Sequence, residues 1–498
     1  MNTFFLTDLI TPSVNVSIIL PELIVAFAGV VVMLYDSFFP RQRAVSGVIA
    51  IAGLMISGIV LGTMWGGSNE ATSWNGMIAH DNLRLGFSLV FLFVSAMTVL
   101  VSTVWVEREN VPAGEYHALL LFATFGMMMM SAGNDLVVIF LGLETLSIAT
   151  YVMAGLRKSD LRSNESAMKY FILGSFASAF LLYGMALIYG ATGSTNLTQI
   201  AAKVADPNFP ALMLIGGAMM IVGFGFKIAM APFHVWAPDV YEGAPTPITA
   251  FLSVASKAAG FVAIMELVFV GFFNQHNVWQ PMFWVLAVLT MTVGNLIALR
   301  QTNVVRLFAY SSVAQAGYML APLAVAGDLK TTQQSLSATI IYIMIYAGMN
   351  LGAFAVIITV ARKTRSAELE SFGGLFEYAP GLTVLMTVFL FALAGIPPLG
   401  GWFAKFQVFF ATANAGTPAG YVLAVFIGVN SVIALFYYAR IAQTMWMQPV
   451  PDGDRTHIRV PPSLAGALGI CVAFTVAVGF YPQLIGRVGD LATFAFLH

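Results

Sequence analysis

Residues 211–232 read ALMLIGGAMMIVGFGFKIAMAP, an apolar run that contains one charged side chain, Lys227. A helix needs about 20 mostly apolar residues to cross the hydrocarbon core of a bilayer, and this run has that length. Lys227 follows two glycines and precedes Pro232 by five residues. Because proline removes a backbone donor and clashes with the preceding turn, the helix is predicted to break beside its lysine. Broken helices at membrane depth are tolerated where they line a cavity, and transporters use them at ion sites.

Similar apolar runs recur along the whole chain. Of its 498 residues, 59% are hydrophobic and 9% are charged, whereas roughly 25% of residues are charged in a soluble globular protein. The sequence therefore predicts an all-α, polytopic membrane protein with no linker long enough for a soluble domain. The fourteen expected spans are residues 17–36, 44–66, 83–105, 116–133, 135–156, 167–191, 211–232, 247–273, 281–299, 303–326, 335–361, 380–415, 420–446 and 463–485.

The basic residues in the loops and toward the ends of the spans are distributed unevenly. Loops that follow odd-numbered spans hold 14 of them, and the opposite side holds 4, namely Arg84, Lys203, Lys330 and Arg487. Lys and Arg accumulate in cytoplasmic loops, so both termini are expected on the outer side of the membrane. The first sixteen residues contain no Lys or Arg and therefore lack the basic start of a signal peptide, so the first apolar stretch is expected to stay as a helix.

Several classes of function are disfavoured by composition. The single cysteine, Cys471, excludes an internal disulfide and argues against thiolate-bound iron–sulfur or zinc. The six histidines are scattered without metal-ligand spacing, and a net charge of −1 gives no basic footprint for nucleic acid. We therefore expect neither a metal nor a redox group in this chain.

Four lysines lie inside predicted spans: Lys169, Lys227, Lys257 and Lys405. A charge at the centre of a spanning helix costs roughly 2.5–3.5 kcal/mol on insertion scales, and such charges mark ion or proton pathways by default. Lys257 lies among the small residues of FLSVASKAAGF (251–261), which leave room for water. Glu144 sits mid-span in LGLETLSIATY (141–151), where its carboxylate would keep a neighbouring lysine charged. A purely structural pairing of Glu144 and snorkelling of Lys227 to the interface are the alternatives.

Lys405 repeats the arrangement seen at Lys227. It lies in LAGIPPLGGWFAKFQVF (393–409), in which Pro397 and Pro398, ahead of the lysine, predict a second helix break. The two broken spans are the seventh and the twelfth, five apart, so a five-helix repeat would be inverted across the membrane. We expect an N-terminal three-helix segment at 1–110, repeats at 111–275 and 276–448, and a last helix in 449–498.

Other charged residues are weaker candidates. Lys169 lies near a cytoplasmic end, where snorkelling explains it equally well. Glu115 begins a span, where the helix dipole alone favours an acidic residue. His234 falls in the break after Pro232, and either a structural role or a proton relay between Lys227 and Lys257 suits it. Glu22 and Glu266 lie near the ends of apolar runs.

Several of these segments resemble a known family. FGFKIAMAPFHVWAPDVYEGAPTPITAFLSVASKAAG (224–260) is similar to a signature of the antiporter-like subunits of respiratory complex I, and PDVYEGAPTP (238–247) to subunit N among them. NDLVVIFLGLETLSIATYV (134–152), RLFAYSSVAQAGYML (306–320) and GIPPLGGWFAKF (395–406) match the same subunit in order and spacing. The resemblance covers the fourth to thirteenth spans.

The resemblance implies a proton-translocating subunit of NADH:quinone oxidoreductase in a bacterial inner (plasma) membrane. It implies that Glu144 and Lys227 form the ion pair of a first half-channel, with Lys257 central, Lys405 on the exit side and His234 as a linker; Lys169 also falls where the family tends to have a lysine. FMN, iron–sulfur clusters and quinone would belong to partner subunits, with no cofactor in this chain. The expected partners are other membrane-arm subunits and lipids, in a hetero-oligomer without nucleic acid.

Three other functions stay open at this point. A stand-alone cation/proton antiporter of the same fold would be recovered alone and would exchange sodium for protons. A structural subunit with relic lysines would leave pumping unchanged when the lysines are replaced. A subunit of a membrane-bound hydrogenase is a further alternative.

Overall fold

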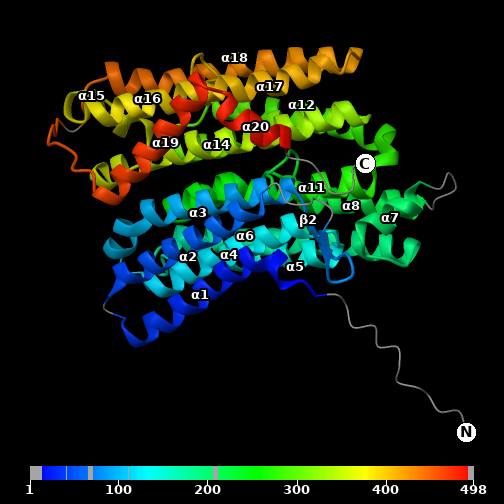
Figure 1. The fold of residues 1–498 in the computed structure, drawn as a ribbon. Coiled ribbons are helices and arrows are strands. Elements are labelled where there is room, and N and C mark those ends of the chain that lie inside the picture. The colour runs from blue at the N-terminus through cyan, green and yellow to red at the C-terminus, as the bar shows by residue number, and fades with distance from the viewer. Residues whose placement is uncertain are drawn as a thin grey trace, which may run out of the picture.

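The computed structural model describes residues 14–40, 42–65, 71–109, 111–205, 211–451 and 453–491. Most of this part is helical (Figure 1). The longer helices are α1 (Leu20–Phe38), α2 (Arg43–Met64), α3 (Asn82–Arg108), α4 (Ala113–Ala132), α5 (Leu136–Ala154), α6 (Leu161–Thr192), α8 (Ala211–Lys227), α12 (His276–Ala298), α13 (Val304–Leu320), α14 (Leu329–Thr364), α16 (Pro380–Ala394), α17 (Gly400–Asn414), α18 (Pro418–Met447) and α19 (Pro462–Phe480). The shorter ones are α7 (Leu197–Val204), α9 (Trp236–Gly243), α10 (Thr246–Phe251), α11 (Lys257–Met265), α15 (Leu375–Tyr378) and α20 (Gln483–Leu491).

Short 3-10 turns, two π-helical segments and one hairpin complete the described part. The 3-10 turns are η1 (Val16–Ile19), η4 (Phe273–Gln275), η5 (Ala321–Val325) and η6 (Leu369–Phe372). The π-helical segments are η2 (Leu252–Ser256) and η3 (Glu266–Gly271), which join α10 and α11 into one continuous helix. Strands β1 (Ala71–Ser73) and β2 (Ile78–His80) form the antiparallel hairpin, in which Thr72 pairs with Ala79.

The predicted fold class is confirmed. In the described part, ten helices are long and apolar enough to cross a membrane. The other predicted spans coincide with α4, with α8, with α13 and η5, and with the pair α16–α17. α9 lies beyond the predicted end of its span at residue 232, and both helix breaks lie beside prolines, as predicted.

Helix boundaries differ from the predicted ones where a helix is longer than its apolar run of residues. α6 and α14 extend beyond 167–191 and 335–361 at both ends, and α12 begins at His276 instead of residue 281. Hydropathy marks the part of a helix that lies in hydrocarbon, whereas the backbone hydrogen bonds continue beyond it. In the opposite sense, the predicted span 463–485 is interrupted at Tyr481–Pro482, because proline cannot continue the helix.

The helices run back and forth between two ends of the bundle (Figure 1). One end, called here the basic face, carries most of the loop arginines, including Arg108, Arg157, Arg300, Arg362 and Arg365. The other end, called here the hairpin face, carries the β1–β2 hairpin, α7 and the start of α14. The prediction that four basic residues lie in loops on this side is wrong for Arg84. It is the third residue of α3 and is 1% exposed, because it pairs with Glu22 inside the protein.

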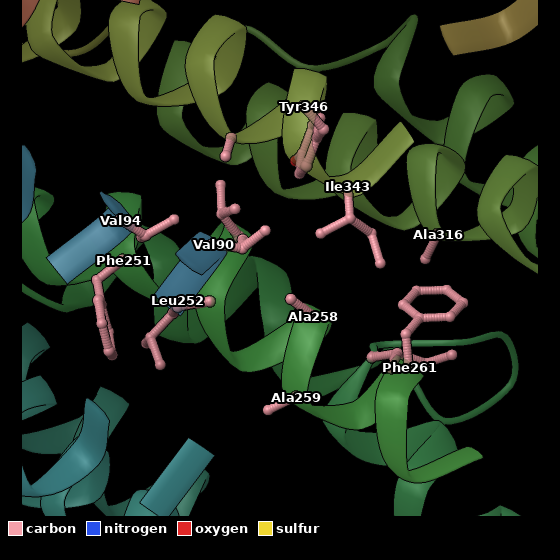
Figure 2. Packing of buried hydrophobic residues seen from close by; sticks show 14 of the residues in the cluster. Val90, Val94, Phe251, Leu252, Ala258, Ala259, Phe261, Ala316, Ile343 and Tyr346 are labelled. Atoms are coloured by element: carbon pink, nitrogen blue, oxygen red, sulfur yellow. The ribbon is translucent and has the colours of Figure 1, made fainter. Parts of the chain in front are cut away.

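The helix from α10 to η3 forms the centre of the molecule, and its apolar stretch is entirely buried. In Figure 1 the first helices (blue to cyan) and the last helices (yellow to red) lie on opposite sides of it. Figure 2 shows Val90 and Val94 of α3, and Ile343 and Tyr346 of α14, packed around this helix. Any charged residue on it therefore faces protein and is shielded from lipid.

Candidate functional site

Lys227 is the last residue of α8 and is 3% exposed. Its Nζ donates hydrogen bonds to Oγ of Ser147 at 3.0 Å and to Oη of Tyr170 at 3.4 Å. The ring centroids of Tyr151 and Tyr170 lie 5.9 and 5.6 Å from Nζ. Hydroxyl groups and aromatic faces therefore solvate this ammonium group.

The break after Lys227 is closed by local hydrogen bonds. Ala229 has φ of 56°, and the next amide, of Met230, donates to the carbonyl of Gly225, as in a helix end closed by a left-handed residue. The indole of Trp236 donates to the carbonyl of Phe226 at 2.9 Å, so the break leaves that acceptor satisfied. The amide of Ala231 donates to Oγ1 of Thr290 at 3.1 Å, which fixes the break to α12.

Glu144 lies on α5, one turn before Ser147, and is partly exposed. Its Oε1 accepts a hydrogen bond from Oγ of Ser178 at 2.5 Å. Among the ion pairs of the described residues, none joins Glu144 to Lys227; Lys227 binds Ser147 and Glu144 binds Ser178 instead. The direct ion pair implied by the family resemblance is thus absent from this conformation, although both residues reach the same part of the bundle.

Lys257 begins α11 and is 2% exposed. Its Nζ donates to two backbone carbonyls, that of Ile228 at 3.1 Å and that of Ser312 at 2.7 Å. Ile228 is the residue next to Lys227, so the break that holds one lysine also supplies an acceptor for the other. Lys257 forms no ion pair with any carboxylate of the described residues.

Lys405 lies on α17, after the second break, and is 7% exposed. Its Nζ donates to the carbonyl of Ala394, the last residue of α16, at 2.8 Å. The ring of Tyr318 lies 4.8 Å from the same ammonium group. Pro397 and Pro398 lie in the connection between α16 and α17, as predicted, and Pro232 lies in that between α8 and α9.

Helix α13 connects Lys257 to Lys405. Ser312, Gln315 and Tyr318 are spaced by three residues and follow one side of it. The carbonyl of Ser312 binds Lys257, and the ring of Tyr318 lies beside Lys405. Gln315, between them, accepts from the hydroxyl of Tyr342 and donates to that of Tyr438 at 3.2 Å. The three lysines 227, 257 and 405, called here the lysine line, are therefore linked by two shared elements, the break after α8 between Lys227 and Lys257 and helix α13 between Lys257 and Lys405.

The weaker candidates have different surroundings. His234 is half-buried in the first break, its Nδ1 has no partner among the described residues, and it interacts electrostatically with Lys257. Lys169 is paired with Glu165 at 2.7 Å and with Asp239 at 2.9 Å, and its side chain is 43% exposed. Glu115 is exposed in the first turn of α4. Only His234 of these three lies beside the lysine line.

Sequence reasoning missed the neutral partners of the lysines. Ser147, Tyr170 and Gln315 are common residue types, and nothing in composition separates them from core residues. The spacing of Glu144 and Ser147, three apart on one helix, was the available signal for the first of them. Arg84 was also missed, because only the structure brings it to Glu22. Among the described residues, no cluster of three or more His, Cys, Asp or Glu is arranged to bind a metal.

Comparisons with known proteins agree with this architecture. The family model described as NADH:quinone oxidoreductase/Mrp antiporter, transmembrane, matches residues 133–433. NADH-quinone oxidoreductase subunit N of Trichlorobacter lovleyi is 41% identical over 479 residues, which cover 95% of this chain and 96% of the relative. The subunit N of Chloroflexus aggregans is 40% identical, with the same coverage of both chains.

Solved structures share the fold. A chain of respiratory complex I from Thermus thermophilus has a TM-score of 0.78 and 31% identity, and the match covers 94% of this chain and 99% of that one. A chain of the Mrp complex from Dietzia has a TM-score of 0.83 with 96% and 97% coverage, but at 21% identity it shares the fold alone. This protein therefore belongs to the NADH:quinone oxidoreductase/Mrp antiporter family of membrane subunits, in the group of NADH-quinone oxidoreductase subunit N.

Proposed function

We propose that this chain translocates protons through Glu144, Lys227, Lys257 and Lys405, as a membrane-arm subunit of an NADH:quinone oxidoreductase. The observation that carries the proposal is the lysine line itself. Three buried lysines lie along shared elements, the break after α8 and helix α13, and none forms an ion pair among the described residues. A structural role would call for a carboxylate beside each lysine, because isolated buried charges are costly.

The arrangement allows each lysine to bias its neighbour. A nearby positive charge disfavours the charged form of a lysine, so proton arrival at one site favours proton release from the next. Glu144 would favour a charged Lys227 whenever its carboxylate moves closer, and His234 would relay protons beside Lys257. Lys169 and Glu115, which lie outside the lysine line, are proposed at most as surface participants.

Redox chemistry enters from other subunits. The curated relatives are named as subunit N of an NADH-quinone oxidoreductase, and we place FMN, iron–sulfur clusters and quinone in other chains of such a complex, as the family resemblance implies. This chain is a multi-pass subunit of a bacterial inner membrane. We place the basic face toward the cytoplasm, because Lys and Arg accumulate there. On that face a cavity of about 930 Å³, lined by Arg108, Arg157, Glu242 and Arg362 among others, gives water access near the start of α10.

The division into inverted repeats, 111–275 and 276–448, is supported by a duplicated backbone motif. After α6 and again after α14, a threonine hydroxyl bonds two residues ahead, and the residue between is left-handed. Three residues further on, the chain bridges to the N-cap residue of α5 or of α13. The residues are Thr192, Gly193 and Asn196 with Asp135, and Thr364, Arg365 and Glu368 with Asn303. One copy lies on the hairpin face and the other on the basic face, as an inverted repeat requires.

The test replaces Lys227 and Lys405 singly by alanine in the assembled complex. We expect NADH-driven acidification of membrane vesicles to fall by about tenfold or more, the scale on which proton-transferring groups contribute. Lys203→Ala, an exposed lysine on α7, is the matched control and should leave acidification unchanged. Normal gradients in assembled Lys227→Ala and Lys405→Ala membranes would contradict the proposal. Recovery of the chain alone, with sodium–proton exchange in liposomes, would favour the antiporter alternative.

A further inference from the structure

A second set of buried charges lies at the hairpin face, away from the lysine line. Arg84 on α3 and Glu22 on α1 are each 1% exposed, and Nη2 of the arginine lies 2.6 Å from Oε1 of the glutamate. The same oxygen also accepts from Nε at 3.2 Å. The pair joins helices 62 residues apart in sequence and lies deep inside the protein.

The guanidinium group of Arg84 has little capacity left for other partners. Its Nη1 donates to the carbonyl of Ala79 at 2.9 Å, and its Nη2 to that of Ile18 at 2.8 Å. The other carboxylate oxygen of Glu22, Oε2, has no hydrogen-bond partner among the described residues although it is fully buried. One acceptor of this ion pair is thus left unused.

Glu266 faces the same region from the central helix. It is 6% exposed, its Oε2 also lacks a partner in the described part of the chain, and its charge interacts with those of Arg84 and Asp81. Glu22 thus binds the guanidinium of Arg84, Asp81 binds its backbone amide at 2.8 Å, and Glu266 interacts with the charges of both Arg84 and Asp81. A buried carboxylate oxygen without a partner is unfavourable unless a proton or water satisfies it.

Two residues shortly before Arg84 in sequence contribute two more buried atoms without a partner among the described residues. These atoms are Nδ1 of His80 and Oδ1 of Asn82. Burial, and to a smaller extent the charge of Arg84, lowers the pKa of His80 on strand β2. A neutral imidazole can both donate and accept a proton. Because a guanidinium is already present, the surroundings suit a proton better than a metal cation.

Two features of the backbone set Glu266 apart from the lysine line. It lies nine residues after Lys257, about two and a half helical turns, so the two side chains leave opposite sides of the helix. Each of them also adjoins a π-helical segment: η2 ends directly before Lys257, and η3 begins at Glu266. Single π-helical turns inside α-helices occur frequently at functional sites.

We infer that Glu266 is a proton-binding group, which with the Glu22–Arg84 pair and His80 forms a hydrated site at the hairpin face. The proton binds a carboxylate oxygen of Glu266 and leaves to water at the hairpin face, with His80 as the neighbouring acceptor. The charge of Lys257 on the same helix would influence how firmly that proton is bound. This inference rests on the proposed function, because it assumes that protons cross this chain.

The experiment uses the complete complex carrying Glu266→Gln, which keeps the shape of the side chain and removes its ionisable group. Glu370→Gln, an exposed glutamate of η6 on the basic face, is the control. Infrared difference spectra between the NADH-reduced and oxidised enzyme should contain a carbonyl band of a protonated carboxylic acid that Glu266→Gln abolishes and Glu370→Gln retains. NADH-driven acidification should fall by about tenfold or more in Glu266→Gln, with NADH oxidation by an artificial acceptor unchanged.

Each outcome is decisive. An unchanged band and unchanged acidification in Glu266→Gln would overturn the inference, even if Lys227→Ala abolishes pumping and so supports the proposed function. If Glu266→Gln does not assemble, Glu266→Asp decides, because a shifted band supports the site and an unshifted band excludes it. Normal pumping in Lys227→Ala together with loss of the band in Glu266→Gln would reject the lysine line and keep the Glu266 site.

Discussion

The three buried lysines differ in the groups that accept their hydrogen bonds. The partners of Lys227 are hydroxyls, which both donate and accept, so they can remain hydrogen-bonded when its amine is neutral. Lys257 has two carbonyls, which only accept and so favour the ammonium form. Lys405 has one carbonyl and an aromatic ring. Lys227 is therefore the member of the lysine line whose partners are hydroxyl groups and not carbonyls.

Ser147→Ala tests that difference at a single residue. A hydrogen bond to a charged group contributes about 1.5–3 kcal/mol, so removing the hydroxyl should weaken the protonated state of Lys227 and slow proton translocation by about tenfold. Thr150→Val, on the same helix, is the control, because its hydroxyl bonds only to carbonyls of α5. Assembly and the rate of acidification in vesicles are the measurements. Equal rates in the two variants would remove Ser147 from the pathway.

At the scale of elements, each helix break presents a carbonyl to a lysine. The carbonyl of Ile228, at the end of α8, binds Lys257, and that of Ala394, at the end of α16, binds Lys405. The C-terminal end of a helix carries a partial negative charge, worth typically 0.3–1 kcal/mol to a nearby cation and up to about 2 kcal/mol when partly buried. The breaks therefore replace the carboxylates that a buried lysine would otherwise require.

The second break depends on Gly395. It has φ of +91°, and a Cβ there would lie 2.8 Å from Cδ of Lys405. Gly395→Ala should therefore lower stability by about 1–2 kcal/mol for the left-handed backbone and also displace the lysine. Gly416→Ala separates the two effects, since Gly416 has φ of +67° with no atom near its Cβ. Thermal unfolding should respond to both variants, and proton translocation to Gly395→Ala alone; pumping retained in Gly395→Ala would contradict this account.

Several elements could be predicted from the sequence for simple reasons. An apolar run of the right length, and a proline beside a lysine, are local signals, so the spans and both breaks were found from single segments. The π-helical segments beside Lys257 and Glu266, and the hairpin 71–80, depend on packing between distant segments, and no local pattern marks them. For the same reason the burial of Arg84 could not be predicted: residue 84 lies at the edge of an apolar run, and only Glu22 explains its burial.

Because the chain has a single native cysteine, the orientation of the whole molecule in the membrane can be measured by labelling added cysteines. Cys471 is 1% exposed, so an impermeant maleimide should not reach it in the folded protein. An added cysteine can then be placed at either face, at exposed Lys330 on the hairpin face or at exposed Lys158 on the basic face.

If the basic face lies in the cytoplasm, Lys330→Cys should be labelled in cells whose outer membrane alone is permeable. Lys158→Cys should be labelled only after the inner membrane is opened, for instance in inverted vesicles. The reverse labelling pattern would show the opposite orientation in the membrane, with the cavity at Arg108 and Arg157 facing the periplasm. In that orientation the same lysine line would take up protons on the opposite side, so the labelling result decides which end of it is the entrance.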